Sequence, residues 1–408
     1  MKNLIRIALF ILVLLLILGL VFKSKIKRLH RVNHLFDKEN IVENFQDAER
    51  FFDVSSLEAS PTPVPIIQDL HYNFPPDFMV NGQKNSTQEF LYETETEGLL
   101  VIHNDTIIHE SYYKGLEPGE SHISWSMSKS FISTMVGIAV DRNLLRVSDM
   151  VVDHLPEFEG TGYEKASVED LLQMSSGVQF VEDYGDFYSD INRFGRTFAM
   201  GSSFKKFALS LQSEREPGRF NHYVSIDTQV LGLVLSKVTG QSLTTLLKDW
   251  IWDPMGMQHP AQWVIDNTGF EMALGGLNAS LSDYAKLGLL YLHDGVFQGK
   301  QIVSKEWVRR ATTPHAPHLM PNQNELSSNS YGYGYQWWTP QFPKNDFFAS
   351  GIYNQFIYVN RDKNLVITKL SADYKFKTGH HVIKAGHIGF FQAIAETFQD
   401  VMSDRIES

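Results

Sequence analysis

The sequence predicts an α+β fold in which one antiparallel sheet is flanked by helices and a helical subdomain is inserted between its strands. Strand patterns occur at both ends of the chain and helical patterns occur between them, which favours a single sheet built from both ends. Residues 99–103 and 106–113, joined at Asn104-Asp105, are typical of a β-hairpin. Three later segments rich in β-branched and aromatic residues predict further strands, at 347–351, 355–360 and 364–370.

The middle of the chain, from about residue 150 to 310, is predicted to be helical. Its apolar segments end at glycines, which commonly stop helices because they adopt left-handed backbone conformations readily. Residues 389–402 predict a closing helix. Between residues 150 and 310, the predicted helices that end at a glycine are 168–174 before Gly177, 228–238 before Gly240 and 282–293 before Gly295.

The composition limits the class of protein. The chain has 408 residues, of which 43% are hydrophobic and 20% charged, so it can bury a sizeable core. A formal net charge of -11 argues against a nucleic-acid partner, because phosphates repel an acidic surface. The absence of cysteine excludes disulfides, thiolate metal sites and a cysteine nucleophile.

An apolar run near the N-terminus predicts a single-pass membrane anchor. Residues 4–22 contain only one charge, Arg6, and are about long enough to cross a bilayer. The basic stretch 23–28 follows without a small-residue cleavage site, which favours an anchor over a cleaved signal peptide. The positive-inside rule would keep the body of the chain cytoplasmic, whereas the short basic head followed by an apolar run is typical of export. We expect the body to be extracytoplasmic.

The sequence divides into three parts. Residues 1–28 form the predicted anchor and its basic flank. Residues 29–80 combine an amphipathic helix, expected over about 29–53, with an extended proline-containing linker at 60–65. Residues 81–408 form the predicted globular domain, because the strand and helix patterns described above all fall within it.

Ser126 and Lys129 are the first candidates for catalysis. Residues 125–140 predict a helix with an apolar face, and residues three apart on a helix share a face. A serine hydroxyl is a weak nucleophile until a base takes its proton, and a buried lysine can lose its charge and act as that base. The spacing predicts a serine hydrolase that forms an acyl-enzyme.

Two further segments complete the predicted site. Tyr223 precedes a predicted helix, and a phenol near a cationic lysine can serve as a general acid and base. Gly351 lies at the end of a predicted strand, where a glycine often allows a close backbone approach. Acyl transfer needs two donors for the developing oxyanion, and the backbone N–H groups of Ser126 and Ile352 are the candidates.

The order Ser-x-x-Lys, Tyr-x-Ser, strand glycine resembles the serine β-lactamase and penicillin-binding-protein superfamily, within its class C β-lactamase-like branch. The resemblance runs from about residue 80 to 400 and includes 168–177, 238–257 and 275–288. It implies Ser126 as the nucleophile, with Lys129 and Tyr223 sharing the proton transfers. Which of the two is the acylation base stays open, as it does for the S-x-x-K signature in general.

Two departures bear on the substrate that the resemblance implies. Ser225 stands where β-lactamases of this type have asparagine, and Ala349 stands where they have a cation. A cation there would pair with a substrate carboxylate, so its absence favours the branch of 6-aminohexanoate-dimer hydrolases and esterases. We expect hydrolysis of an ester or small amide, with no cofactor. The predicted substrate contacts are Ser225, Gly351, Gln355 and Trp338.

Several alternatives stay open at this stage. A penicillin-binding, D,D-peptidase or β-lactamase activity, or a ligand sensor that does not turn over, would use the same fold. The histidines His380, His381 and His387 could bind a metal, but their irregular spacing favours solvated or packing roles, and we predict no metal site. Aromatic residues that either line a cleft or fill the core are Tyr331, Tyr333, Tyr335, Trp337 and Trp338.

Overall fold

The computed structural model of the chain describes residues 4–7, 9–10, 28–30, 32, 34–80, 82–322, 325–376 and 384–400. The predicted membrane anchor at 4–22 lies mostly outside these ranges. Within them, no single helix is both long enough and apolar enough to span a bilayer.

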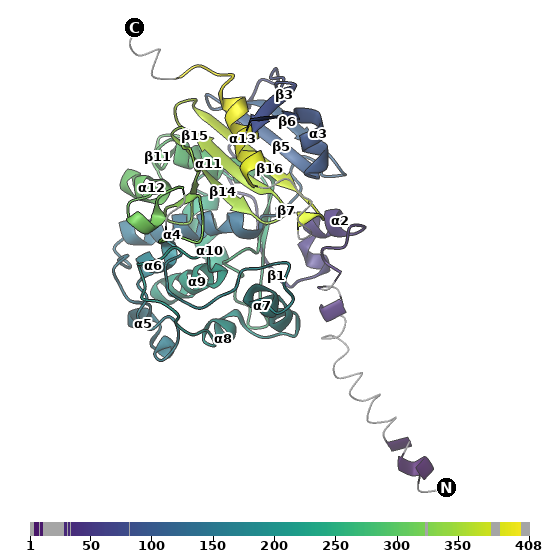
Figure 1. The fold of residues 1–408 in the computed structure, drawn as a ribbon, viewed down its shortest axis with the longest axis vertical. Helices are drawn as coiled ribbons and strands as arrows, with labels where there is room; N and C mark the ends of the chain where they lie inside the picture. Colours follow the sequence, from purple (N-terminus) through teal and green to yellow (C-terminus); the bar gives the residue numbers. More distant parts are fainter. Residues whose placement is uncertain are drawn as a thin grey trace.

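An eight-stranded sheet forms the centre of the fold (Figure 1), and its strands come from both ends of the chain, as predicted. In spatial order they are β12 (Gly332–Tyr333), β13 (Trp338–Thr339), β14 (Asp346–Gly351), β15 (Gln355–Asn360), β16 (Leu365–Ser371), β5 (Thr96–His103), β6 (Thr106–Tyr112) and β2 (Ile67–Gln68). The predicted hairpin is β5–β6 and the three predicted late strands are β14, β15 and β16. All neighbours pair antiparallel except the edge strand β2, which pairs parallel with β6.

Both faces of this sheet are covered, which explains why its central strands are buried along nearly their whole length. Leu100 and Val366 point into the larger core, which contains α4 and α11, whereas Leu99 and Ile367 point into a second core against α3 and α13. This alternation follows from the two-residue repeat of a strand. The four helices are α4 (Lys129–Asp141), α11 (Leu281–Leu292), α3 (Thr87–Glu93) and α13 (Lys384–Ala395).

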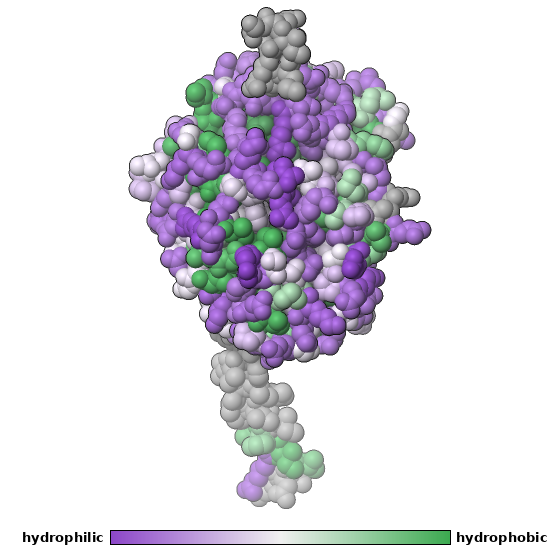
Figure 2. Space-filling view, turned by 90° about the vertical axis from the view of Figure 1, so that its left-hand side faces the viewer, coloured by the Kyte–Doolittle hydropathy of each residue, from purple (hydrophilic) through white to green (hydrophobic). Residues whose placement is uncertain are grey.

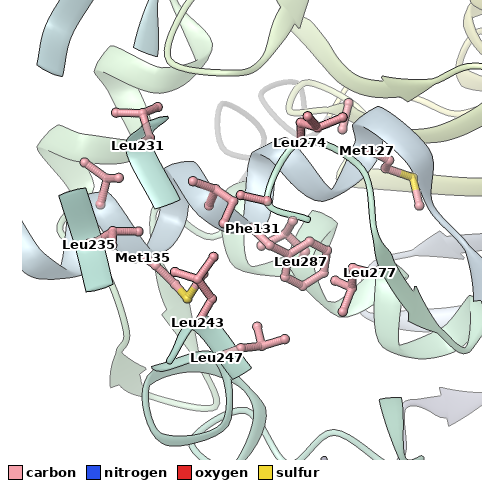
Figure 3. Close-up of a cluster of buried hydrophobic side chains, with 14 of the residues drawn as sticks. Met127, Phe131, Met135, Leu231, Leu235, Leu243, Leu247, Leu274, Leu277 and Leu287 are labelled. Atoms are coloured by element: carbon pink, nitrogen blue, oxygen red, sulfur yellow. The ribbon is translucent and has the colours of Figure 1, made fainter. Parts of the chain in front are cut away.

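The helical subdomain lies between β6 and β12 in the chain. The range predicted for it, about 150–310, also includes α11, which packs on the sheet. The subdomain packs against α4, and Figure 3 shows Met135 of α4 beside Leu243 from that subdomain. Its helices are α5 (Val151–His154), α6 (Val168–Leu172), α7 (Asp190–Ala199), α8 (Phe204–Ala208), α9 (Ser225–Thr239), α10 (Leu243–Leu247) and α12 (Lys305–Thr312). Short 3-10 or π turns are η3 (Pro156–Phe158), η4 (Lys248–Trp252) and η5 (Pro317–Leu319).

The predicted helix over residues 29–53 is found only in part, because turns at 34–40 interrupt it. The segment contains α2 (Ile41–Gln46) and η1 (Ala48–Arg50), followed by β1 (Val54–Leu57). Phe45 of α2 is fully buried against the ring of Trp125, so this short helix is held by tertiary packing. β1 opens a four-stranded sheet with β8 (Ala261–Val264), β9 (Leu277–Ala279) and β7 (His122–Ile123).

The remaining elements lie at the periphery. One small two-stranded sheet pairs β3 (Asp77–Val80) with β4 (Gln83–Ser86), and another pairs β10 (Val296–Phe297) with β11 (Lys300–Gln301). The closing helix α13 begins five residues earlier than predicted and ends at Ala395. On the face drawn in Figure 2, hydrophilic residues predominate and hydrophobic ones gather in separate patches.

Candidate active site

Ser126 and Lys129 meet at the junction between a short turn and a core helix. The helix predicted from Trp125 is divided into the 3-10 turn η2 (Trp125–Ser128) and α4, whose first residue is Lys129. Trp125 has a φ of 45°, in the left-handed region that a bulky residue rarely adopts. This local strain is typical of functional sites, and it sets the Ser126 hydroxyl 2.8 Å from the Lys129 amine.

The Lys129 amine is buried and has three partners. Its Nζ lies 2.8 Å from Ser126 Oγ, 3.2 Å from Ser225 Oγ and 2.6 Å from the carbonyl oxygen of Leu274. Burial lowers the pKa of Lys129 to about 7, although the carboxylates of Glu182 and Asp227 oppose this shift. Near neutral pH a large fraction of this lysine therefore carries no charge.

The hydrogen bonds around Lys129 leave its lone pair to Ser126. The Ser225 hydroxyl donates to Glu182 Oε1 at 2.5 Å, so its oxygen accepts from Lys129, and the carbonyl of Leu274 can only accept. A neutral amine has two N–H groups, and these two acceptors use both. The remaining lone pair faces the Ser126 hydroxyl and can accept its proton.

Tyr223 lies beside this pair, as the sequence predicts. Its ring centroid is 5.3 Å from Lys129 Nζ, and it stacks on Trp338 with 5.4 Å between centroids. Burial, helped by the nearby Glu182 carboxylate, raises the pKa of the Tyr223 phenol well above its usual range, and interactions with the Ser126 and Ser225 hydroxyls oppose the rise. The phenol is therefore neutral at physiological pH and can donate a proton.

The predicted oxyanion donors also come together. Gly351 ends β14 so close to the turn before Ser126 that a Cβ on it would lie 2.3 Å from the carbonyl oxygen of Ser124. This approach brings the N–H of Ile352 to the cavity that Ser126 lines. In the described part of the chain, neither the Ser126 N–H nor the Ile352 N–H donates to another protein group. Both are therefore available to a substrate oxygen.

These groups open into a cavity of about 480 Å³, and we name it the leaving-group cavity because Tyr223 lines it. Of the predicted substrate contacts, Gly351 and Trp338 line this cavity, whereas Ser225 and Gln355 do not. Ser225 is buried beneath it and positions Lys129. The Gln355 amide holds the turn after β14 by donating to the carbonyl oxygens of Ile352, Tyr353 and Ser371.

Three residues of the site have no signal in the sequence. Glu182 accepts hydrogen bonds from the backbone and hydroxyl of Ser225, and Tyr184 donates to the same carboxylate at 2.6 Å. Lys384, at the start of α13, places its ammonium 3.8 Å from the ring centroid of Trp338. Burial alone lowers the pKa of Lys384 to about 8. All three lie outside recognisable motifs and reach the cavity only through folding.

The structure gives no support for a metal centre among the residues it describes. Two of the three histidines considered, His380 and His381, lie outside those residues. His387 is fully buried, and its ring packs against Phe90 and Phe356. Of the aromatic cluster, Trp338 lines the cavity, whereas Tyr333, Tyr335 and Trp337 are buried in the core.

The fold and the Ser-x-x-Lys geometry together define a serine hydrolase. Comparison with known proteins identifies its family: the chain belongs to the Beta-lactamase family, whose model matches residues 92–381. It is 28% identical over 308 residues to the 6-aminohexanoate-dimer hydrolase of Paenarthrobacter ureafaciens, covering 73% of this chain and 78% of that protein.

Solved structures confirm the fold. A candidate 6-aminohexanoate-dimer hydrolase from Bacillus anthracis superposes with a TM-score of 0.78 at 22% identity, covering 89% of this chain and 95% of that one. EstCE1, a hydrolase with promiscuous acyltransferase activity, has a TM-score of 0.58 at 14% identity over 76% of this chain and 96% of its own. The prediction of a β-lactamase-like α+β fold is confirmed.

Proposed function

We propose that the protein hydrolyses a carboxylic ester or a small amide through an acyl-enzyme on Ser126. The observation that carries this proposal is the hydrogen-bond arrangement around Lys129, which directs the lone pair of a buried amine at the Ser126 hydroxyl. The similarity to a 6-aminohexanoate-dimer hydrolase and the fold shared with EstCE1 support the two substrate classes.

Each proton in the proposed reaction has a donor and an acceptor. Ser126 Oγ attacks the substrate carbonyl carbon while Lys129 takes the hydroxyl proton, and the N–H groups of Ser126 and Ile352 stabilise the oxyanion. Tyr223 donates its proton to the departing alkoxide or amine and regains one from Lys129. Water then attacks the acyl-enzyme and gives its proton to the same pair. The pair returns this proton to Ser126 Oγ as the acid departs, which restores the Ser126 hydroxyl.

Covalent labelling tests the nucleophile directly. A fluorophosphonate probe is expected to label the wild-type protein on one serine and to leave Ser126→Ala unlabelled. The matched control is Ser130→Ala, which removes a buried hydroxyl from the first turn of α4. Equal labelling of wild type and Ser126→Ala would contradict the assignment, and a burst of product without steady turnover would indicate a sensor instead of an enzyme.

A β-lactam or D,D-peptide is the second candidate substrate, and Lys384 is the observation that favours it. Its ammonium lies at the leaving-group cavity, and no described carboxylate pairs with it. A substrate carboxylate could therefore bind there, although the strand position that usually supplies the cation holds Ala349. A panel of p-nitrophenyl esters, 6-aminohexanoate dimer, a chromogenic cephalosporin and a D-Ala-D-Ala peptide separates the candidates, and we expect the esters to turn over fastest.

We further propose that residues 4–22 tether the enzyme to a membrane, with the hydrolase domain on the extracytoplasmic side. The length and apolar character of this run support the proposal. Fractionation of cells that express the full chain tests it, because Leu14→Asp and Leu16→Asp together should move the protein from the membrane pellet to the supernatant. Protease added to intact cells would digest the domain only if it faces outward.

A further inference from the structure

A second cavity, of about 110 Å³, opens on the same serine. Its walls are mainly apolar, and it shares only Ser126, Tyr184 and Ile352 with the leaving-group cavity. The nucleophile and one oxyanion donor therefore lie where the two cavities meet. The other lining residues include Leu35, Phe52, Phe194, Gly195, Phe198 and Leu274.

We propose that this second cavity binds the acyl group of the substrate, and that it selects esters and amides of short unbranched aliphatic acids. The inference rests on the proposed function and adds the substrate class. A carbonyl held by the N–H groups of Ser126 and Ile352 has two substituents, and the leaving group must reach Tyr223 to be protonated. Because Tyr223 lines only the first cavity, the acyl group occupies the second.

The chemistry of the walls defines the acyl group. Leu35, Phe52 and Phe194 each have less than a tenth of their surface exposed, and no described lysine, arginine or carboxylate lines the cavity. A charged acyl group would lose its hydration there without a partner. The volume is roughly that of four water-sized groups, at about 30 Å³ each, which matches a chain of about four carbon atoms.

Gly195 lines this cavity without a side chain. It lies on α7 between Ile191 and Phe198, on the face that these residues turn toward the core. A Cβ built on Gly195 meets no atom within 4 Å, and its φ lies outside the left-handed region. A side chain can therefore be added without backbone strain, and it enters space that the proposed acyl chain would use.

The closing experiment measures kcat/KM for p-nitrophenyl acetate, butanoate, hexanoate and octanoate. For the wild type we expect a rise of about fourfold per methylene up to four to six carbons, since each buried methylene contributes about 0.8 kcal/mol, and then a fall. Gly195→Leu should lower the butanoate and hexanoate values at least tenfold and leave acetate within threefold. Gly195→Ala, the matched control, adds one carbon and should shift the optimum only slightly.

Alkylboronic acids provide a second measurement on the unaltered protein. Ser126 Oγ adds to boron, its proton passes to Lys129, and the alkyl group takes the place of the acyl chain without any leaving group. Inhibition should strengthen from methyl to butyl boronic acid. A flat series in wild-type esters and boronic acids, or an equal loss for all esters in Gly195→Leu, would overturn the inference while the hydrolase stands. No ester turnover together with no fluorophosphonate labelling would overturn the proposed function itself.

Discussion

The direction of the hydrogen bonds around Lys129 depends on a single carboxylate. Glu182 takes the Ser225 hydroxyl proton, which turns that oxygen into an acceptor for Lys129. Glu182 also raises the pKa of Lys129 and of Tyr223 through its negative charge. One residue therefore sets both the hydrogen-bond direction and the ionisation of the two groups that we propose to move protons.

This dual role predicts a pH effect. The kcat/KM of the wild type should rise with pH through about 7, because only the neutral form of Lys129, whose pKa is about 7, accepts a proton. Glu182→Gln retains an oxygen acceptor for Ser225 but removes the charge, so the acidic limb should move to lower pH. A pH profile of ester hydrolysis for wild type and variant checks both expectations. An acidic limb of kcat/KM at the same pH in Glu182→Gln as in wild type would contradict the electrostatic role of Glu182.

Sequence reasoning could find the three central residues but not their supports. Ser126, Lys129 and Tyr223 fall in short patterns whose chemistry can be stated from spacing. Glu182 has no such pattern, since it lies in a loop and reaches Ser225 across 43 residues of sequence. Ser225 was expected to contact substrate, yet it lies beneath the cavity and positions the lysine, because its side chain points into the core.

At the scale of elements, the site depends on the contact between the end of β14 and the turn η2. The glycine at position 351 has no side chain to keep these backbones apart, and its neighbours Ser350 and Ile352 line the cavity. The oxyanion donors come from one residue on each element. Their relative position is therefore set by the backbone packing of β14 on η2, and the Gln355 side chain supports the turn that carries Ile352.

Gly351→Ala should lower kcat more than it lowers stability. The added Cβ would approach the Ser124 carbonyl oxygen to 2.3 Å, so β14 must shift and the Ile352 N–H moves with it. Loss of one oxyanion donor typically costs about 100- to 1000-fold in kcat. Ser350→Ala, which adds no atom toward Ser124, serves as the control. Kinetics and thermal unfolding of both variants measure the effect. A wild-type kcat in Gly351→Ala would contradict the role of this close approach in positioning the Ile352 N–H.

The elements themselves were predictable where periodicity is strong. The late strands and α9, which ends at Gly240 with a φ of 68°, follow their patterns closely. The segment before residue 58 does not, because its conformation depends on distant partners: β1 pairs with β8, more than 200 residues away. Local sequence carries no information about such pairing, and β1 was not predicted for that reason.

The whole molecule buries several ionisable groups outside the site. Lys369 lies on β16 with no exposed surface, and its amine donates to Ser371. Burial lowers its pKa to about 7, although the carboxylates of Asp373 and Glu97 oppose the shift. Such a lysine makes the folding free energy depend on pH.

The sign of this dependence follows from proton counting. Between pH 7 and the unfolded pKa of about 10.4, Lys369 is neutral when folded and protonated when unfolded, so stability rises with pH. Replacing it by methionine should reduce the slope of unfolding free energy against pH by about 1.4 kcal/mol per pH unit in this window. Denaturant unfolding at pH 8, 9 and 10 measures the slope, and identical slopes in wild type and Lys369→Met would refute the assignment.

The second cavity, which we propose to bind the acyl group, is lined in part by Val32, Leu35, Phe36 and Phe52. These residues precede the part of the chain that the family model matches. The groups that transfer protons all lie within the matched part. Exchanging this N-terminal segment between relatives would therefore change part of the cavity wall and leave the proton-transferring groups unaltered, which offers a route to new ester preferences.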